Sequence, residues 1–193
     1  MKRLFFFLCF LFILTGAVWA ESGIREKLQQ IKGVSDIKEM KIDSFDEYYE
    51  FWYEQPVDHE NPALGSFKQR VLLGHKKKQQ APVIVEIQGY NIWTPEAGEL
   101  ANLLDGNQLT IEHRFFNNSV PAGGVPWKYL TIKQAATDQH EVIQAIKKAI
   151  YPDSKWITTG ISKGGQTTIF HRYFYPEDVD ISVPYVAPLN LEY

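Results

Sequence analysis

A serine enclosed by two glycines is the first feature of this sequence that could do chemistry. Residues Gly160 to Gly164 read Gly-Ile-Ser-Lys-Gly, which matches the pattern G-x-S-x-G. In that pattern the serine occupies a strained turn between a strand and a helix, so that its hydroxyl projects above a sheet. The flanking glycines are required because the backbone passes too close to its neighbours to admit side chains. The pattern predicts that Ser162 is a nucleophile.

A phosphate-binding glycine loop or an ordinary turn would explain the same five letters. A P-loop places its lysine directly before a serine or threonine, whereas Lys163 precedes Gly164. The surrounding residues favour the nucleophile. Residues 156–159 are typical of a short strand, and residues 163–174 are typical of a helix that ends before Pro176.

A serine nucleophile also needs donors that stabilise the oxyanion of its transition state. One donor is usually the backbone N–H after the serine, here that of Lys163, and the other comes from the loop after the third strand. Residues 82–87 are almost all apolar, as in a strand covered on both faces, and Gln88-Gly89-Tyr90 follows. We therefore predict that Tyr90 supplies the second donor through its N–H or its hydroxyl. A turn glycine and a packed aromatic residue are the alternative.

The hydroxyl must also be activated by a histidine that an acid orients, and in enzymes with this elbow both follow the serine. His171 is on the helix that follows Ser162, about 13 Å along an axis that rises roughly 1.5 Å per residue, so it does not reach the hydroxyl. Asp178 and Asp180 belong at the opposite edge of the sheet. The remaining histidines precede the serine and are expected to be surface or packing residues: His59, His75, His113 and His140. The acid and base are therefore expected beyond Tyr193.

The pattern of the other segments predicts an α/β fold of the α/β-hydrolase type, with a mostly parallel sheet flanked by helices. Strands are expected at 47–53, 66–73, 82–87, 108–112, 156–159 and 181–186, and helices at 94–105, 131–150 and 163–174. The first two strands favour a hairpin, and the later strands alternate with helices as in βαβ units. Thr94-Pro95 gives a helix start, and Thr131 with Gln134 forms a capping-box pair. The sheet is expected to be truncated after about its sixth strand.

The first twenty residues predict a signal peptide. Lys2 and Arg3 precede an apolar stretch from Leu4 to Leu14, and the segment ends on small residues at Ala20. A membrane anchor is the alternative, but the stretch is shorter than the roughly twenty residues of a spanning helix. We expect cleavage after Ala20, and export to the periplasm or the extracellular space without stable membrane insertion.

The amino-acid composition gives no support to disulfide bonds in the mature chain or to a nucleic-acid partner. The only cysteine, Cys9, lies in the predicted signal peptide, so the mature chain would form no disulfide. The formal net charge is −3, which gives no support to a nucleic-acid partner. The predicted chemistry requires no metal and no cofactor. Residues 21–46 are expected to be an N-terminal arm or a short surface helix, and residues 47–193 an incomplete α/β-hydrolase domain.

Several ordered motifs carry a resemblance to a known family. They are residues 54–59 (Glu-Gln-Pro-Val-Asp-His), 67–70, 112–116 with Ser119 and Pro121, 129–131 with Gln134 and Ala135, and 160–165. Together they resemble the N-terminal part of the secreted serine exopeptidases that include the bacterial tripeptidyl aminopeptidases, which are distantly related to the prolyl carboxypeptidases. The resemblance covers roughly residues 48–190.

The resemblance implies a peptidase that removes short peptides from free N-termini, sometimes with a preference for proline, and uses Ser162 as its nucleophile. It also implies that the acid and histidine follow a helical cap. Glu112 ends a central strand together with Arg114, where its carboxylate could contact the amine of the peptide substrate or pair with an arginine. We favour the arginine pair. An esterase or acyltransferase of the same fold, or a non-catalytic exported fragment, remain alternatives.

Overall fold

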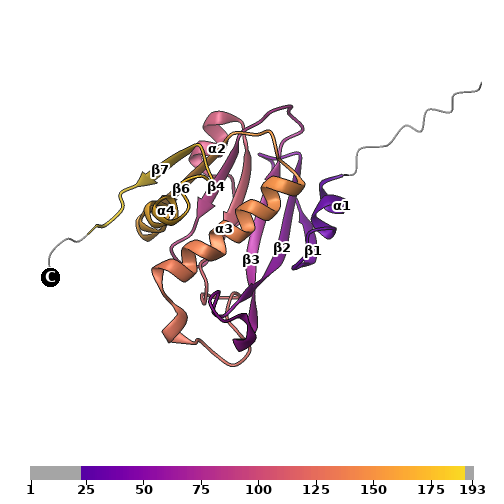
Figure 1. Cartoon of the computed structure of the whole chain (residues 1–193). Helices are drawn as coiled ribbons and strands as arrows, with labels where there is room; N and C mark the ends of the chain where they lie inside the picture. The colour runs from indigo at the N-terminus through magenta and orange to yellow at the C-terminus, as the bar shows by residue number, and fades with distance from the viewer. Residues whose placement is uncertain (1–22, 190–193) are drawn as a thin grey trace, which may run out of the picture.

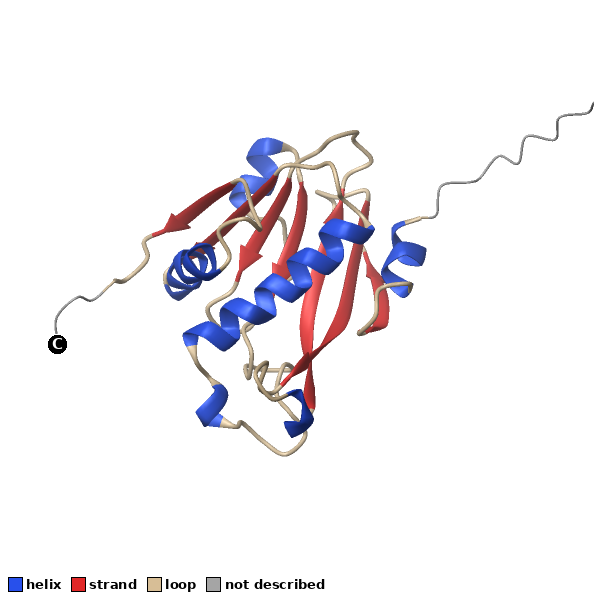
Figure 2. Cartoon of the chain, in the orientation of Figure 1, coloured by secondary structure: helices blue, strands red, loops and turns tan. Residues whose placement is uncertain are grey.

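The computed structural model describes residues 23–189, so the predicted signal peptide, residues 1–20, lies outside the described part. Its helices are α1 (Ile24–Gln29), α2 (Glu99–Leu104), α3 (Ile132–Ala149) and α4 (Lys163–Phe174), with 3-10 turns at Pro62–Leu64 and Trp127–Tyr129. Its strands are β1 (Val34–Met40), β2 (Glu47–Pro56), β3 (Ser66–His75), β4 (Val83–Ile87), β5 (Asn107–Ile111), β6 (Trp156–Ile161) and β7 (Ile181–Tyr185). Helices cover both faces of one sheet (Figures 1 and 2).

The sheet combines an antiparallel half with a parallel half. Its strand order is β1-β2-β3-β5-β4-β6-β7. The pairs β1–β2, β2–β3 and β3–β5 are antiparallel, whereas β5–β4, β4–β6 and β6–β7 are parallel. The predicted hairpin is thus confirmed as β2–β3, and the predicted βαβ units form the parallel half. The carboxyl ends of β4 and β6 meet at one edge, where the glycine–serine turn lies.

The main core lies between the sheet and the helices α1 and α3. In Figure 1, α3 crosses in front of the strands and α1 lies near β1. Val142, Ile143 and Ile146 of α3 are fully buried there. Their spacing along the helix is that of one apolar stripe, so burial of this stripe holds α3 on the sheet. A smaller cluster around Ile84 and Leu100 holds α2 on the opposite face.

The N-terminal segment differs from the expected arm. Residues 34–40 form β1, which pairs with β2 through an irregular register between Ser35 and Lys38. Ile24 and Leu28 of α1 are buried in the main core. The segment is therefore part of the sheet domain. Its polar edge strand, with Asp36 at a positive φ of 53°, lacks the alternation that would reveal a strand.

The helix expected from residue 94 begins later, at Glu99. Gly98 is extended (φ −70°, ψ 165°), and its N–H donates to the Gln108 side-chain oxygen at 2.7 Å. The Gln108 amide in turn donates to the Glu96 carbonyl oxygen at 2.9 Å. These contacts with β5 satisfy the backbone of residues 96–98 outside a helix, so the local start signal at Thr94-Pro95 is overridden.

Within residues 23–189, no helix combines the length and the apolar character needed to cross a bilayer.

Candidate active site

Ser162 occupies the turn between β6 and α4. Its backbone has φ 57° and ψ −119°, a conformation that L-residues rarely adopt. The Ser162 N–H donates to the Tyr185 carbonyl oxygen at 3.0 Å, and the side chain is exposed at the carboxyl edge of the parallel strands. A strained turn that holds one hydroxyl clear of the sheet is the geometry of a nucleophile elbow.

The glycines around Ser162 are required by close backbone packing. A Cβ at Gly164 would lie 2.6 Å from the Ile87 carbonyl oxygen, and a Cβ at Gly160 would contact that same oxygen at 2.6 Å. A Cβ at Gly89 would lie 2.7 Å from the Gly164 nitrogen. The elbow and the loop after β4 therefore touch backbone to backbone, which places Gly89 and Tyr90 directly beside the nucleophile turn.

The Lys163 side chain joins this loop to the elbow. Its Nζ donates a hydrogen bond to the Gly89 carbonyl oxygen. The same Nζ lies 4.6 Å from the ring centroid of Tyr90 and 4.9 Å from that of Phe116, two rings that pack edge to face. Burial lowers the pKa of the Lys163 ammonium from its ordinary value. Tyr90 itself remains half exposed, with its ring over the lysine.

Glu112 is fully buried, and its carboxylate is occupied by the protein. One oxygen accepts the Ile92 N–H and the other accepts the Ser119 hydroxyl, both at 2.9 Å. The nearest guanidinium is that of Arg70, 3.8 Å away. We therefore assign Glu112 to the structural alternative rather than to contact with a substrate amine, and its arginine partner is Arg70 of β3 instead of its chain neighbour Arg114.

None of the five histidines is hydrogen-bonded to Ser162. His140 and His171 both contact the Asp178 carboxylate, at 2.8 and 3.0 Å, at the opposite edge of the sheet. His113 is the histidine on the elbow side, where it lines a hollow with Lys163. Burial, followed by the Lys163 charge, lowers the pKa of His113 to about 4, so its imidazole is neutral near pH 7. Its Nδ1 lies 3.1 Å from the Arg114 carbonyl oxygen.

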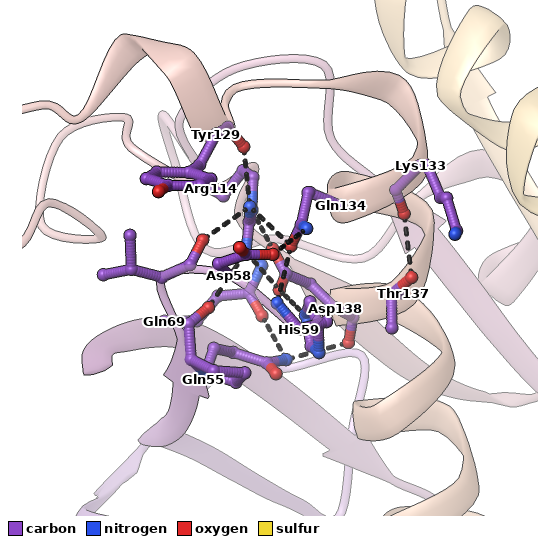
Figure 3. Close-up of polar contacts among 12 residues, drawn as sticks. Gln55, Asp58, His59, Gln69, Arg114, Tyr129, Lys133, Gln134, Thr137 and Asp138 are labelled. Carbon is purple, nitrogen blue, oxygen red and sulfur yellow. Dashed lines mark hydrogen bonds and ion pairs between the residues drawn. The ribbon is translucent and has the colours of Figure 1, made fainter. Parts of the chain in front are cut away.

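Apart from residues 160–165, which contain Ser162, the motifs that carry the family resemblance contribute residues to a network around Arg114 (Figure 3). Arg114 and Asp138 are both fully buried and form a two-point ion pair, with Nε–Oδ2 at 2.6 Å and Nη2–Oδ1 at 2.9 Å. The Arg114 guanidinium also donates to the carbonyl oxygens of Pro56, Val57 and Tyr129. This buried network therefore ties three separate segments to the N-terminal end of α3.

Two further side chains complete the network. Gln134 donates to Asp58 at 2.6 Å and accepts the His59 N–H at 3.0 Å, so it does not return to the Thr131 N–H as a full capping box would. Thr131 still caps α3 by accepting from the Gln134 N–H. His59 lies 2.7 Å from Asp138. These motifs thus build a buried scaffold that joins the ends of β2 and β5 to α3.

Sequence reasoning missed Asp138, the partner of Arg114. The two residues are on different elements, and Asp138 falls on a helix face that also carries polar residues. The signal that could have revealed the pair is the position of Asp138 among the residues of α3 that face the core. A charged group is rarely fully buried unless it is paired, so an aspartate at such a position indicates a partner.

A hollow of about 550 Å³ adjoins the elbow between α3 and α4. Most of its wall surface is apolar and comes from Leu130, Ile132, Ala135, Ala136, Phe170 and Leu189. Its polar lining residues are His113, Thr131, Gln139, Lys163, Gln166 and Thr167. A pocket of this character can hold an apolar side chain and fix its orientation with few polar contacts. Among residues 23–189, no group of three histidine, cysteine or acidic side chains is arranged to hold a metal ion.

An antiparallel hairpin joined to a parallel sheet, with a serine at the strained turn after a central strand, defines an α/β hydrolase. Acetyl xylan esterase 1 from Thermoanaerobacterium has this fold, with a TM-score of 0.55 and 14% identity over 83% of this chain and 55% of that one. The acetyl xylan esterase from Paenibacillus gives a TM-score of 0.52 at 17% identity, over 82% of this chain and 54% of that one. The chain belongs to the PS-10 peptidase S37 family, whose model matches residues 19–192.

Two relatives with similar sequences are consistent with this family membership. The prolyl tri/tetrapeptidyl aminopeptidase of Streptomyces mobaraensis is 40% identical over 169 residues, which cover 87% of this chain and 34% of that protein. The thymus-specific serine protease of Mus musculus is 30% identical over 153 residues, 72% of this chain and 30% of that protein. The chain therefore spans about a third of the length of these relatives.

Proposed function

We propose that Ser162 is the nucleophile of a secreted serine peptidase that releases short peptides from the N-termini of polypeptides. The observation that carries this proposal is the elbow itself, with an exposed Ser162 at φ 57° beside the Gly89–Tyr90 loop. Membership of a peptidase family and the similarity to a prolyl tri/tetrapeptidyl aminopeptidase indicate the substrate class.

In the proposed reaction the Ser162 oxygen attacks the scissile carbonyl, and a base takes the hydroxyl proton. The backbone N–H groups of Lys163 and Tyr90 would stabilise the oxyanion, and the proton then leaves with the departing amine. Water hydrolyses the acyl-enzyme that remains. Because no histidine among residues 23–189 is hydrogen-bonded to Ser162, we propose that the acid and base are supplied by polypeptide beyond Tyr193.

Export is part of the proposal. It rests on the sequence of residues 1–20, with a basic start, an apolar stretch and small residues before the cleavage point. N-terminal sequencing of the protein recovered from the culture medium or periplasm should begin at Glu21. Recovery of the intact N-terminus from the cytoplasm would contradict export.

The test of the catalytic proposal begins by extending the reading frame beyond Tyr193 and expressing the full-length protein. A fluorophosphonate probe should label this protein, and Ser162→Ala should abolish both labelling and the release of tripeptides. Ser182→Ala, on β7, is the matched control and should label normally. Hydrolysis of short acyl esters without any release of peptides would instead assign the protein to the esterases, and no labelling at all would support the non-catalytic alternative.

A further inference from the structure

Hydrogen bonds from several elements hold the loop that carries Tyr90, among them one from Arg70 to the Ile92 carbonyl oxygen. The Tyr90 carbonyl oxygen accepts the His113 N–H at 2.9 Å, and the Ile92 N–H donates to Glu112. The Gly89 carbonyl oxygen accepts a hydrogen bond from the Lys163 ammonium, and this contact comes from the elbow. The residue that binds the loop through its side chain, Lys163, is therefore also the residue that follows the nucleophile and carries the first oxyanion donor, its backbone N–H.

The Gly89 carbonyl and the Tyr90 N–H belong to one peptide group. That group is planar and trans, so its oxygen and its N–H point in opposite directions. A contact that fixes the direction of the oxygen also fixes the direction of the N–H. In the described part of the chain, the Tyr90 N–H donates no hydrogen bond to another residue, so it is free to serve a ligand.

We propose that Lys163 is a positioning residue for the oxyanion hole: its ammonium holds the Gly89 carbonyl and thereby directs the Tyr90 N–H toward the oxyanion. The inference rests on the proposed function, because it assigns a donor to that reaction. The rings of Tyr90 and Phe116 keep the ammonium in place through cation–π contacts. Lys163 thus supplies one oxyanion donor, its own backbone N–H, and orients the other, the Tyr90 N–H, through its side chain.

The experiment compares Lys163→Met, which removes the donor, with Lys163→Arg, which keeps a charged donor able to stack on aromatic rings. Loss of one oxyanion donor typically lowers kcat by about 10²-fold or more. We expect Lys163→Met to lower kcat of the full-length protein by about 10²-fold with KM changed less than about threefold. Lys163→Arg should recover at least about tenfold of that loss. A kcat within about twofold of the unmodified protein, or a loss confined to KM, would overturn the proposal.

Lys147→Met is the matched control. Lys147 also donates to a carbonyl oxygen, that of Asp178, and lies over an aromatic ring, that of Trp156, but at the opposite edge of the sheet. It should leave kcat unchanged, whatever it does to stability. An equal fall in kcat for Lys147→Met and Lys163→Met would show that loss of stability, and not donor placement, is responsible.

A second readout separates this inference from the proposed function. In the 193-residue chain labelled with ¹³C, the Gly89 carbonyl resonance should move upfield in Lys163→Met and stay near its original position in Lys163→Arg and Lys147→Met. An unchanged Gly89 resonance in Lys163→Met would refute the positioning role even if the protein is a peptidase. If no peptide is hydrolysed, a fall in the fluorophosphonate labelling rate of Lys163→Met would still support it.

Discussion

At the scale of single residues, the strained backbone of Ser162 and the buried charges of Arg114 and Asp138 have separate tasks. A serine at φ 57° costs on the order of 1–3 kcal/mol, which the surrounding backbone contacts must offset. Arg114 and Asp138 carry opposite charges in a fully buried position, where each depends on the other. The first arrangement exposes a reactive group, and the second fixes the segments on which the elbow edge is built.

Removal of one member of the buried pair should be severely destabilising. Asp138→Asn keeps the shape of the side chain but leaves the Arg114 charge unpaired, so we expect a loss of about 3–5 kcal/mol in the free energy of unfolding. Urea denaturation of the chain measures it. Lys133→Gln, which removes an exposed ion pair with Glu60, should cost less than about 1 kcal/mol. A loss below about 1 kcal/mol for Asp138→Asn would contradict the role given to the network.

The sequence was sufficient to predict the turn at Ser162 because its signal is local. Five consecutive residues and the two elements beside them contain the whole motif. The partner of Arg114 was not predictable in this way, because Asp138 lies on another element and the pairing exists only in three dimensions. The same holds for Lys163, whose side chain meets the Gly89 carbonyl only when β4 and β6 lie next to each other.

At the scale of elements, the contact of β4 with the β6–α4 turn leaves no room for side chains. A methyl group at Gly160 would contact the Gly164 and Ile87 backbones. Gly160→Ala should therefore separate the strand from the helix and lower the midpoint of urea denaturation substantially, whereas Gly123→Ala, in open space, should leave it nearly unchanged. Equal midpoints for the two variants would refute the close approach.

A charged cluster joins the middle of α3 to the last turn of α4 and should make stability depend on pH. The hydrogen bond that His140 donates to the Asp178 carboxylate raises the pKa of His140, and the His140 ring stacks on Tyr175 at a centroid distance of 4.1 Å. Burial alone would raise the pKa of Asp178, but hydrogen bonds from His140 and His171 lower it below its ordinary range. The cluster thus favours a protonated His140 beside an ionised Asp178.

A histidine whose folded pKa is raised stabilises the protein fully below its unfolded pKa, about 6.5, and loses that contribution as pH rises through the folded pKa. The stability advantage of the unmodified chain over His140→Gln should therefore shrink as the pH rises above about 6.5 and through the raised pKa of His140. Denaturant titrations at several pH values measure it. His75, whose pKa is lowered by burial, should show the opposite slope when it is replaced by glutamine. A difference for His140→Gln that is constant with pH would exclude the linkage.

Most elements could be predicted because their signal is periodic or bounded by proline and glycine. α4 matches its predicted range, β4 begins one residue later than predicted, and β5 is shifted by one residue toward the N-terminus. β1 was not predicted, since a polar edge strand with an irregular register shows no alternation. The start of α2 was misplaced because Gln108, a residue of another strand, holds Gly98 extended.

At the scale of the whole molecule, the described sheet ends at β7, which is paired on one side by β6. Ile181 is 53% exposed, and α4 packs against the strand from one face. In the isolated chain, amide hydrogens of β7 should therefore exchange faster than those of the central strands β4 and β5. Native-state hydrogen exchange measures this order. Protection of β7 equal to that of β4 would contradict it.

The buried network around Arg114 has a consequence for how proteins of this type are recognised in genomes. Only residues 160–165 of the motifs that make the chain identifiable include the nucleophile, whereas residues such as Gln55, Asp58 and Gln134 lie in the scaffold. A search built on them retrieves chains that share this architecture, whether or not they retain a working nucleophile. A census of enzymes would need a separate filter for Ser162 and for the lysine that follows it.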